Sequence, residues 1–275
     1  MIAEQASRTA LLVAAYRARA SGRADPVCND PWAAALAGEE GLALAAAYDP
    51  GYPPMELWTA VRTAYFDAQV LHFTAPERAF DQVVVLGAGL DTRAARLSKP
   101  GLVFFEIDHP STQADKRRRL ATLAGYPAAA ATQVACDFEV DDFFAKLTGA
   151  GFDPARPAVI LWEGVTPYLP EIAIRKTLRR IAEGCHARTV LLFDHLGNQR
   201  PGNQTASHEF VEGLGEKVLW GSNDPLPMLY EEGFRHVRSL SFDEACLTLT
   251  GTYAREREFR FQRMVLASRT PTPLL

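Results

Sequence analysis

The chain has 275 residues, 48% of them hydrophobic and 23% charged, which is the balance of an ordinary globular protein with a sizeable core. Its formal net charge of -4 gives no electrostatic reason to expect a nucleic acid or an anionic membrane as partner, and we expect neither. The 4 cysteines are scattered without metal-site spacing, so we expect no disulfide framework and no metal site. The absence of a secretory signal pattern and of an apolar run of about 20 residues predicts a cytoplasmic protein.

The first part of the chain, residues 1–75, shows only helical patterns. Apolar residues recur at helical spacing over residues 4–20, and this predicted helix ends at Ser21-Gly22. Asp30-Pro31 is typical of the cap and first position of a second helix, and a long third helix is expected over residues 56–73. We therefore predict an N-terminal helical extension that precedes any strand.

From residue 76 onward, short β-branched runs alternate with helical patterns, which predicts parallel βαβ units with right-handed crossovers. A polar, Gly-rich segment over residues 196–223 has the length of a lid or a disordered loop. A helix over 225–232 and two more strands complete a predicted seven-stranded, mostly parallel sheet with helices on both faces, whose last strand inserts antiparallel. The predicted strands are residues 82–86, 102–107, 131–136, 158–162, 189–193, 234–240 and 259–267.

The strongest local motif follows the first predicted strand, at Leu86-Gly87-Ala88-Gly89-Leu90-Asp91. Glycines at this position permit a tight turn and let a ligand approach the backbone closely. Asp91 stands near the place where a dinucleotide-binding motif has its third glycine, and its carboxylate would repel a pyrophosphate. The turn therefore favours a ligand without phosphates there, and a bare strand-to-helix turn is the alternative.

Acidic residues follow the next two strands at the same edge of the predicted sheet. Glu106 or Asp108 ends the second strand, about twenty residues past the glycines, where a carboxylate can accept hydrogen bonds from ribose hydroxyls, and we favour Asp108. Asp137 and Phe138 follow the third strand, where an acid can accept from an adenine amino group and a ring can stack on the base. Ligands of open α/β sheets bind at this edge, so the acids and the glycine turn are interpreted together.

Two further charged residues complete this set. Glu163 follows the fourth predicted strand, where a buried carboxylate is costly unless the amino group or sulfonium of a cationic ligand is its partner. Arg62, in the helical N-terminal part, can form a bidentate pair with a ligand carboxylate. The alternative for Arg62 is an ordinary ion pair with an acidic side chain of the protein itself.

Together these segments resemble the leucine carboxyl methyltransferase family, in the family's order, across residues 60–170. The combination G-A-G-x-D-T-R followed by E-x-D-x-P is not a general Rossmann pattern. The resemblance implies a Rossmann-like class I methyltransferase fold and S-adenosylmethionine as the methyl donor. The matching stretches are Arg62-Thr63-Ala64-Tyr65-Phe66-Asp67, Leu86-Gly87-Ala88-Gly89-Leu90-Asp91-Thr92-Arg93, Phe105-Glu106-Ile107-Asp108-His109-Pro110, Asp137-Phe138 and Glu163-Gly164-Val165-Thr166-Pro167-Tyr168-Leu169.

The resemblance also implies a role for each matched residue. Tyr168 would shape the floor beneath the donor methyl group, and Lys116 would orient the segment after the acidic strand. The family's cofactor-binding positions fall on Arg62 for the methionine carboxylate, Glu163 near its amino group, Gly87, Ala88 and Gly89 in the turn, Asp108 for the ribose, and Asp137 and Phe138 at the adenine.

The predicted activity is O-methylation of a carboxylate or a hydroxyl of a small molecule, in secondary metabolism, under the cover of the N-terminal helices. The donor is already activated, so the protein mainly aligns the reactants and excludes water. A carboxylate acceptor requires no base, whereas a hydroxyl is helped by one, and His195 after the fifth strand is the residue we nominate.

Three other functions stay open at this point. The best-known family member methylates the C-terminal carboxyl group of a protein, an NAD-dependent oxidoreductase can share the fold, and a non-catalytic cofactor-binding protein would carry the same binding residues. A homodimer is also left open by the sequence.

Overall fold

The computed structural model describes residues 7–51, 55–138, 140–197, 204–251 and 261–272, with the backbone alone for residues 204–208. The strands are β1 (Gln82–Leu86), β2 (Val103–Asp108), β3 (Ala131–Ala135), β4 (Ala158–Trp162), β5 (Val190–Leu196), β6 (His236–Ser241) and β7 (Gln262–Ser268). The helices are α1 (Arg8–Ser21), α2 (Ala33–Tyr48), α3 (Met55–Phe73), α4 (Arg93–Leu97), α5 (Pro110–Leu120), α6 (Phe143–Gly149), α7 (Glu171–Gly184), α8 (Gln204–Gly213), α9 (Leu226–Glu231) and α10 (Phe242–Thr250).

The strands form one seven-stranded sheet in the order β3-β2-β1-β4-β5-β7-β6. The first five strands run parallel, with Val84 of β1 paired to Phe105 on one side and to Ile160 on the other. β7 lies antiparallel between β5 and β6. The predicted seven-stranded, mostly parallel sheet with an antiparallel last strand is thereby confirmed.

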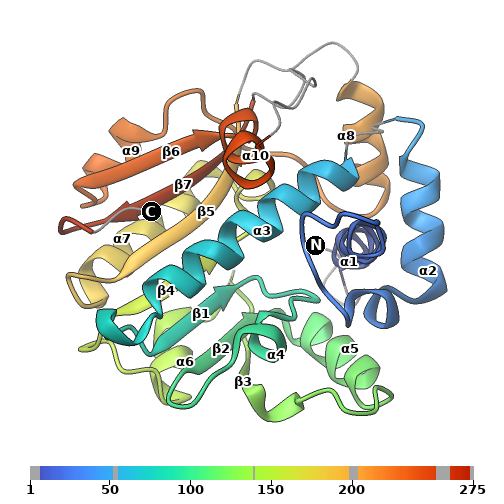
Figure 1. Cartoon of the computed structure of the whole chain (residues 1–275). Coiled ribbons are helices and arrows are strands. Elements are labelled where there is room, and N and C mark those ends of the chain that lie inside the picture. Colours follow the sequence, from blue (N-terminus) through green and yellow to red (C-terminus); the bar gives the residue numbers. More distant parts are fainter. Residues whose placement is uncertain (1–6, 52–54, 139, 198–203, 252–260, 273–275) are drawn as a thin grey trace.

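Alternate residues of each strand belong to two separate hydrophobic cores, because successive side chains of a strand point to opposite faces of the sheet. Val83 and Val85 of β1 belong to the core that includes residues of α1, α2 and α3. Val84 and Leu86 belong to the core that includes residues of α6, α7 and α9. Figure 1 shows α3 crossing one face of the sheet, with α1, α2 and α8 grouped at one side of the molecule.

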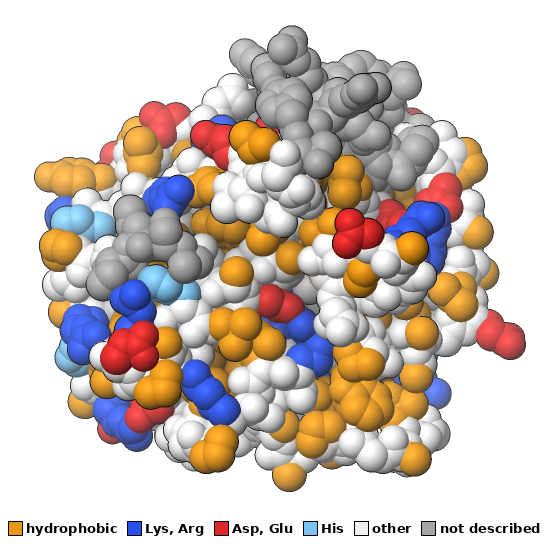
Figure 2. All heavy atoms as spheres, in the orientation of Figure 1, with side chains coloured by type: hydrophobic (Ala, Val, Ile, Leu, Met, Phe, Trp, Pro, Cys, Tyr) orange, Lys and Arg blue, Asp and Glu red, His pale blue; other side chains and the backbone are white. Residues whose placement is uncertain are grey.

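The N-terminal helices are present as predicted and share the first core with the strands. Ser7 caps α1 by accepting from the backbone N–H of Ala10 (3.2 Å), and Asp30 accepts from that of Trp32 (3.1 Å) just before α2. Within the part of the chain that the structure describes, no helix is both long and apolar enough to cross a membrane. On the face drawn in Figure 2, acidic and basic side chains are interspersed among hydrophobic ones.

Two helices of the C-terminal part are absent from the sequence prediction. α8 lies within the segment that we expected to be a lid or a disordered loop, and α10 follows β6 in the stretch between the last two predicted strands, for which we predicted no element. A capping box starts α10, since Ser241 and Glu244 each satisfy the other's backbone N–H. This Ser-x-x-Glu spacing is the sequence signal that could have revealed the helix.

Candidate functional site

The glycine turn after β1 is held against two other parts of the chain. Gly87 (φ 67°) and Gly89 (φ 47°) adopt left-handed backbone conformations that favour glycine. A Cβ on Gly87 would lie 2.4 Å from Cγ2 of Val165, and one on Gly89 would lie 3.1 Å from Cβ of Ala10 in α1. The turn therefore requires glycine, as the sequence indicated, and it places the start of α1 over the carboxyl end of β1.

The structure separates the two acids at the end of β2. Glu106, only 1% exposed, accepts from Nζ of Lys116 (2.6 Å), and the same Nζ donates to the carbonyl oxygen of Asp91 (2.6 Å). Asp108 accepts from the backbone N–H groups of Gly89 and of His109. Burial nevertheless raises the pKa of Asp108 above its ordinary value. Glu106 is engaged with Lys116, which leaves Asp108 as the acid beside the glycine turn.

Buried ion pairs join α3, the start of α4 and the ends of β4 and β5. Nε of Arg62 lies 2.8 Å from Oε1 of Glu163, and its Nη1 donates to Oδ2 of Asp194 (2.9 Å). Arg93, only 2% exposed, pairs with Glu163 (2.7 Å) as well as with two aspartates. We call this set the arginine cluster; it consists of Arg17, Arg62, Arg93, Arg96, Asp30, Asp67, Asp91, Glu163 and Asp194.

The arginines of this cluster keep two of its carboxylates ionised. Burial raises the pKa of Glu163, but the positive charges of Arg93 and Arg62 outweigh it, and the pKa is lowered overall. Burial also raises the pKa of Asp91, but the positive charges of Arg93 and Lys116 outweigh it and lower the pKa to about 2. Glu163 thus finds its partners within the protein, so its burial does not by itself require a cationic ligand, contrary to the sequence argument.

The arginine cluster still contains groups suited to the amino and carboxyl groups of an amino acid. Among the described residues, Nε of Arg62 and Oε2 of Glu163 are buried and make no well-aligned hydrogen bond, although both lie within ion-pair distance of their partners. Gly164 (φ 69°) follows directly, and a Cβ there would come within 3.4 Å of the Arg62 guanidinium. The methionine end of S-adenosylmethionine needs a donor such as a guanidinium for its carboxylate and an acceptor such as a carboxylate for its ammonium group.

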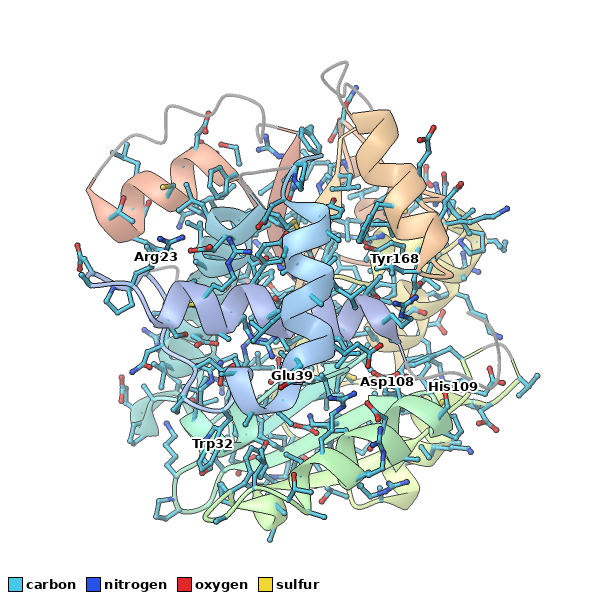
Figure 3. All side chains as sticks on the ribbon, turned by 90° about the vertical axis from the view of Figure 1, so that its right-hand side faces the viewer. Arg23, Trp32, Glu39, Asp108, His109 and Tyr168 are labelled. Atoms are coloured by element: carbon cyan, nitrogen blue, oxygen red, sulfur yellow. The ribbon has the colours of Figure 1, made fainter. Side chains whose placement is uncertain are left out.

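The remaining predicted site residues lie around the same edge. Figure 3 looks onto the side of the molecule that carries Asp108, His109 and Tyr168. Burial raises the pKa of Tyr168, in the 3₁₀ turn η3 (Thr166–Tyr168) after β4, above its ordinary range. Phe138, 37% exposed, has its ring centroid 6.1 Å from that of Phe143, and Asp137 lies 3.9 Å from Nε2 of His109.

His195 lies apart from this group. It follows Asp194 in β5, and because neighbouring strand residues alternate, Asp194 faces Arg62 whereas His195 packs against Trp220 in the other core. The His195 side chain is fully buried, and burial lowers its pKa to about 4. The structure therefore brings Arg62, Glu163 and the glycine turn together at one edge and places His195 on the opposite face of the sheet.

Sequence reasoning missed the two residues that hold Arg62 and Glu163 in place. Asp194 fixes Arg62 and also accepts from the backbone N–H of Gly164 (2.6 Å), while Arg93 fixes Glu163. Arg93 was visible as the last residue of the Asp-Thr-Arg stretch after the glycine turn. Asp194 had no signal beyond its place at the end of the fifth strand.

Two solved structures with the same fold cover nearly the full chain. A protein from Thermobifida fusca, named by inference as a methyltransferase, matches at a TM-score of 0.65 and 15% identity, over 98% of this chain and 97% of its own. A DUF574 family protein from Streptomyces avermitilis matches at a TM-score of 0.68 and 13% identity, over 98% and 99%. At such low identity the likeness shows the fold alone.

Sequence comparison is more specific. A protein of Mycolicibacterium smegmatis, named by inference as an S-adenosyl-L-methionine-dependent methyltransferase, is 38% identical over 229 residues, which are 79% of this chain and 73% of the relative. A protein of Frankia alni with the same inferred name is 33% identical over 233 residues, 82% of this chain and 75% of its own. The family model described as leucine carboxyl methyltransferase matches residues 10–182. This chain therefore belongs to the leucine carboxyl methyltransferase family.

Proposed function

We propose that this protein, an S-adenosylmethionine-dependent methyltransferase, transfers the methyl group to a carboxylate or hydroxyl oxygen of a small molecule in secondary metabolism. The observation that carries the proposal is the buried Arg62–Glu163 pair beside the glycine turn, because it offers a zwitterionic amino acid one partner for each charge. The family description, carboxyl methylation, supports oxygen as the accepting atom.

In this proposal Arg62 holds the methionine carboxylate, Glu163 its ammonium, Asp108 the ribose, and Asp137 with Phe138 the adenine. When bound, S-adenosylmethionine supplies a methyl group on a positively charged sulfur. The protein's own contribution is to align the acceptor oxygen with that methyl group and to keep water out, so no charged intermediate has to be stabilised.

The surroundings of the edge support a small acceptor. The start of α1 lies over the glycine turn, and Tyr48 of α2 packs edge-on against Phe210 of α8, with ring centroids 5.0 Å apart. These helices form a cover over the edge, which suits a small molecule more than the end of a folded protein. Asp91 stands near the place where a dinucleotide-binding motif has its third glycine, and this departure from the motif counts against the oxidoreductase alternative, although the charge of Asp91 is paired with Arg93.

Titration calorimetry with S-adenosylmethionine, S-adenosylhomocysteine and NAD tests the donor site. We expect both adenosyl compounds to bind and NAD not to bind. Asp108→Ala should lower their affinity on the order of 5- to 100-fold, the effect of losing a charged hydrogen bond. Asp25→Ala, which removes an exposed acid after α1, is the matched control and should bind as the unaltered protein does.

Unchanged affinity in Asp108→Ala would remove Asp108 from the donor site. Binding of NAD in preference to both adenosyl compounds would overturn the proposed function. Transfer of radiolabelled methyl to small carboxylic acids and phenols then identifies the accepting group, whereas transfer only to a peptide with a free C-terminal carboxylate would favour the protein-directed alternative.

A further inference from the structure

One carboxylate outside the arginine cluster, that of Glu216, also lies near the edge of the sheet at the carboxyl ends of the parallel strands. Glu216 follows α8, in the segment that returns toward β5, and Oε1 of Glu216 lies 3.4 Å from the hydroxyl of Thr9 and 3.5 Å from that of Ser7, both of which donate to it. Oε2 accepts no hydrogen bond from the residues that the structure describes. One oxygen of this carboxylate is thus fixed and the other is free to accept.

The surroundings of Glu216 locate it between the donor site and the cover. Its partners Ser7 and Thr9 start α1, whose Ala10 packs on Gly89 of the glycine turn. On the other side, the backbone N–H groups of Leu219 (2.7 Å) and Trp220 (3.1 Å) donate to the carbonyl oxygen of Pro167, next to Tyr168. Glu216 therefore lies in the segment that connects the start of α1, beside the glycine turn, with the η3 turn.

The carboxylates of Glu216 and Asp108 lie close enough to affect each other. Burial raises the pKa of Glu216 and the charge of Asp108 adds slightly to the effect, while the positive charge of the N-terminus and the hydroxyls of Thr9 and Ser7 oppose it. The charge of Glu216 in turn helps burial to raise the pKa of Tyr168. A carboxylate acceptor would bring one more negative charge close to Glu216 and Asp108, which is unfavourable where water is scarce, whereas a hydroxyl is neutral and can donate a hydrogen bond.

We propose that Glu216 is a catalytic residue that selects a neutral hydroxyl acceptor over a carboxylate and takes its proton. This inference rests on the proposed function and narrows its acceptor to the hydroxyl class. In the transfer, the acceptor oxygen forms its bond to the methyl carbon and gives its proton to Glu216. The bond between that carbon and the donor sulfur breaks with its electron pair kept by the sulfur, and the protonated Glu216 then returns the proton to water.

A purely structural role is the competing explanation, because a carboxylate beside the first turn of a helix stabilises that helix. The two roles differ in what Glu216→Gln does to stability. When burial raises the pKa of a carboxylate, the folded protein is most stable with that group protonated, and its stability falls as pH rises through that pKa. Replacing the charged Glu216 by a neutral amide in Glu216→Gln should therefore not lower the melting temperature at pH 7. If the charge of Glu216 instead stabilises α1, removing that charge should lower the melting temperature of the protein.

The experiment compares the unaltered protein, Glu216→Gln and the control Glu212→Gln, which changes an exposed acid one turn earlier in α8. Radiolabelled methyl transfer is measured with a set of simple phenols and alcohols and with a shape-matched set of carboxylic acids. Thermal melting is measured at pH 5 and pH 7, and S-adenosylhomocysteine affinity is measured by calorimetry. We expect transfer to hydroxyl compounds, a loss of about 100-fold or more in Glu216→Gln with unchanged S-adenosylhomocysteine affinity, and no loss in Glu212→Gln.

Preference for the carboxylic acids, or equal rates of Glu216→Gln and the unaltered protein with a hydroxyl acceptor, would overturn the inference. A lower melting temperature of Glu216→Gln at pH 7 would mean that its loss of transfer reflects lost structure and would overturn the inference. A protein that binds S-adenosylhomocysteine but methylates neither set would overturn it as well. An unaltered protein that does not bind S-adenosylhomocysteine would overturn the proposed function itself and this inference with it.

Discussion

The two sides of the sheet edge are held together by different forces. On the donor side, the arginine cluster joins buried charges at short distances, such as 2.7 Å between Arg93 and Glu163. On the proposed acceptor side, α8 and the segment of Glu216 are attached to α2 and α1 by ring contacts such as Tyr48–Phe210 and by hydrogen bonds of 3.4 and 3.5 Å to Glu216.

This difference matches the role that we propose for each side. Paired buried charges are costly to separate, so they keep Arg62 and Glu163 in fixed positions before a ligand arrives. Ring contacts and long hydrogen bonds are individually weak, so α8 and the Glu216 segment can move away without disturbing the arginine cluster. We expect the donor site to be rigid and the acceptor side to open and close.

The largest effect should come from breaking the arginine cluster. Arg93→Met leaves Asp91, Asp67 and Glu163 without a shared cation, and removing one partner of a buried pair costs about 3–5 kcal/mol. Urea denaturation measures the loss. Arg118→Met is the matched control, because Arg118 is 73% exposed and its pair with Asp115 should contribute about 1 kcal/mol or less. Equal losses in both variants would contradict a donor side held by buried charge.

A smaller effect is expected from removing a single donor-side contact to the ligand. Arg62→Ala should weaken S-adenosylhomocysteine binding by about 1–3 kcal/mol, because it removes charge-assisted hydrogen bonds to the carboxylate. Calorimetry measures the change, with thermal melting as a check that the protein still folds. If Arg62 only stabilises Asp194, the melting temperature will fall while the affinity of the folded protein stays the same.

A substitution in α8 should have a smaller effect, which should be confined to α8 and the residues that follow it. Phe210→Ala removes the edge-on contact with Tyr48, which is worth about 1 kcal/mol. Amide hydrogen exchange in residues 209–216 should become several-fold faster while S-adenosylhomocysteine affinity is unchanged. Leu71→Ala, at a position of α3 that is 49% exposed, is the control and should leave this exchange as it was. Faster exchange along the donor side would mean that the two sides are not independent.

The smallest effect on activity is expected at His195, which lies outside both regions. Its pKa is lowered by burial from 6.5 to about 4, so the folded protein resists its protonation and loses stability as pH falls from 6.5 toward 4. His195→Phe should flatten that loss in thermal melts and leave the pH dependence of methyl transfer between pH 6.5 and 8 unchanged. A shifted rate profile in this range would restore His195 as the base.

The sequence predicted the elements whose signals are local. β1, β2, β4 and β5 each contain a run of at least three apolar residues, and the glycine turn follows from the need for positive φ at Gly87 and Gly89. The arginine cluster escaped prediction because its partners are far apart in the chain: Arg62 and Asp194 are separated by 132 positions. Glu216 escaped for the same reason, because only the folded chain brings it to Ser7 and Thr9.

The position of β7 has a consequence for the order in which the protein can assemble during synthesis. Among the described strands β6 pairs with β7 alone, and β7 lies between β6 and β5 although it follows both of them in the chain. β1 to β5 can therefore associate as soon as they are made, whereas β6 must wait without a strand neighbour until residues 262–268 appear. A chain that stopped before β7 would leave β6 without a strand partner and β5 as the edge of the sheet, so this flank of the fold is complete only once residues 262–268 are present.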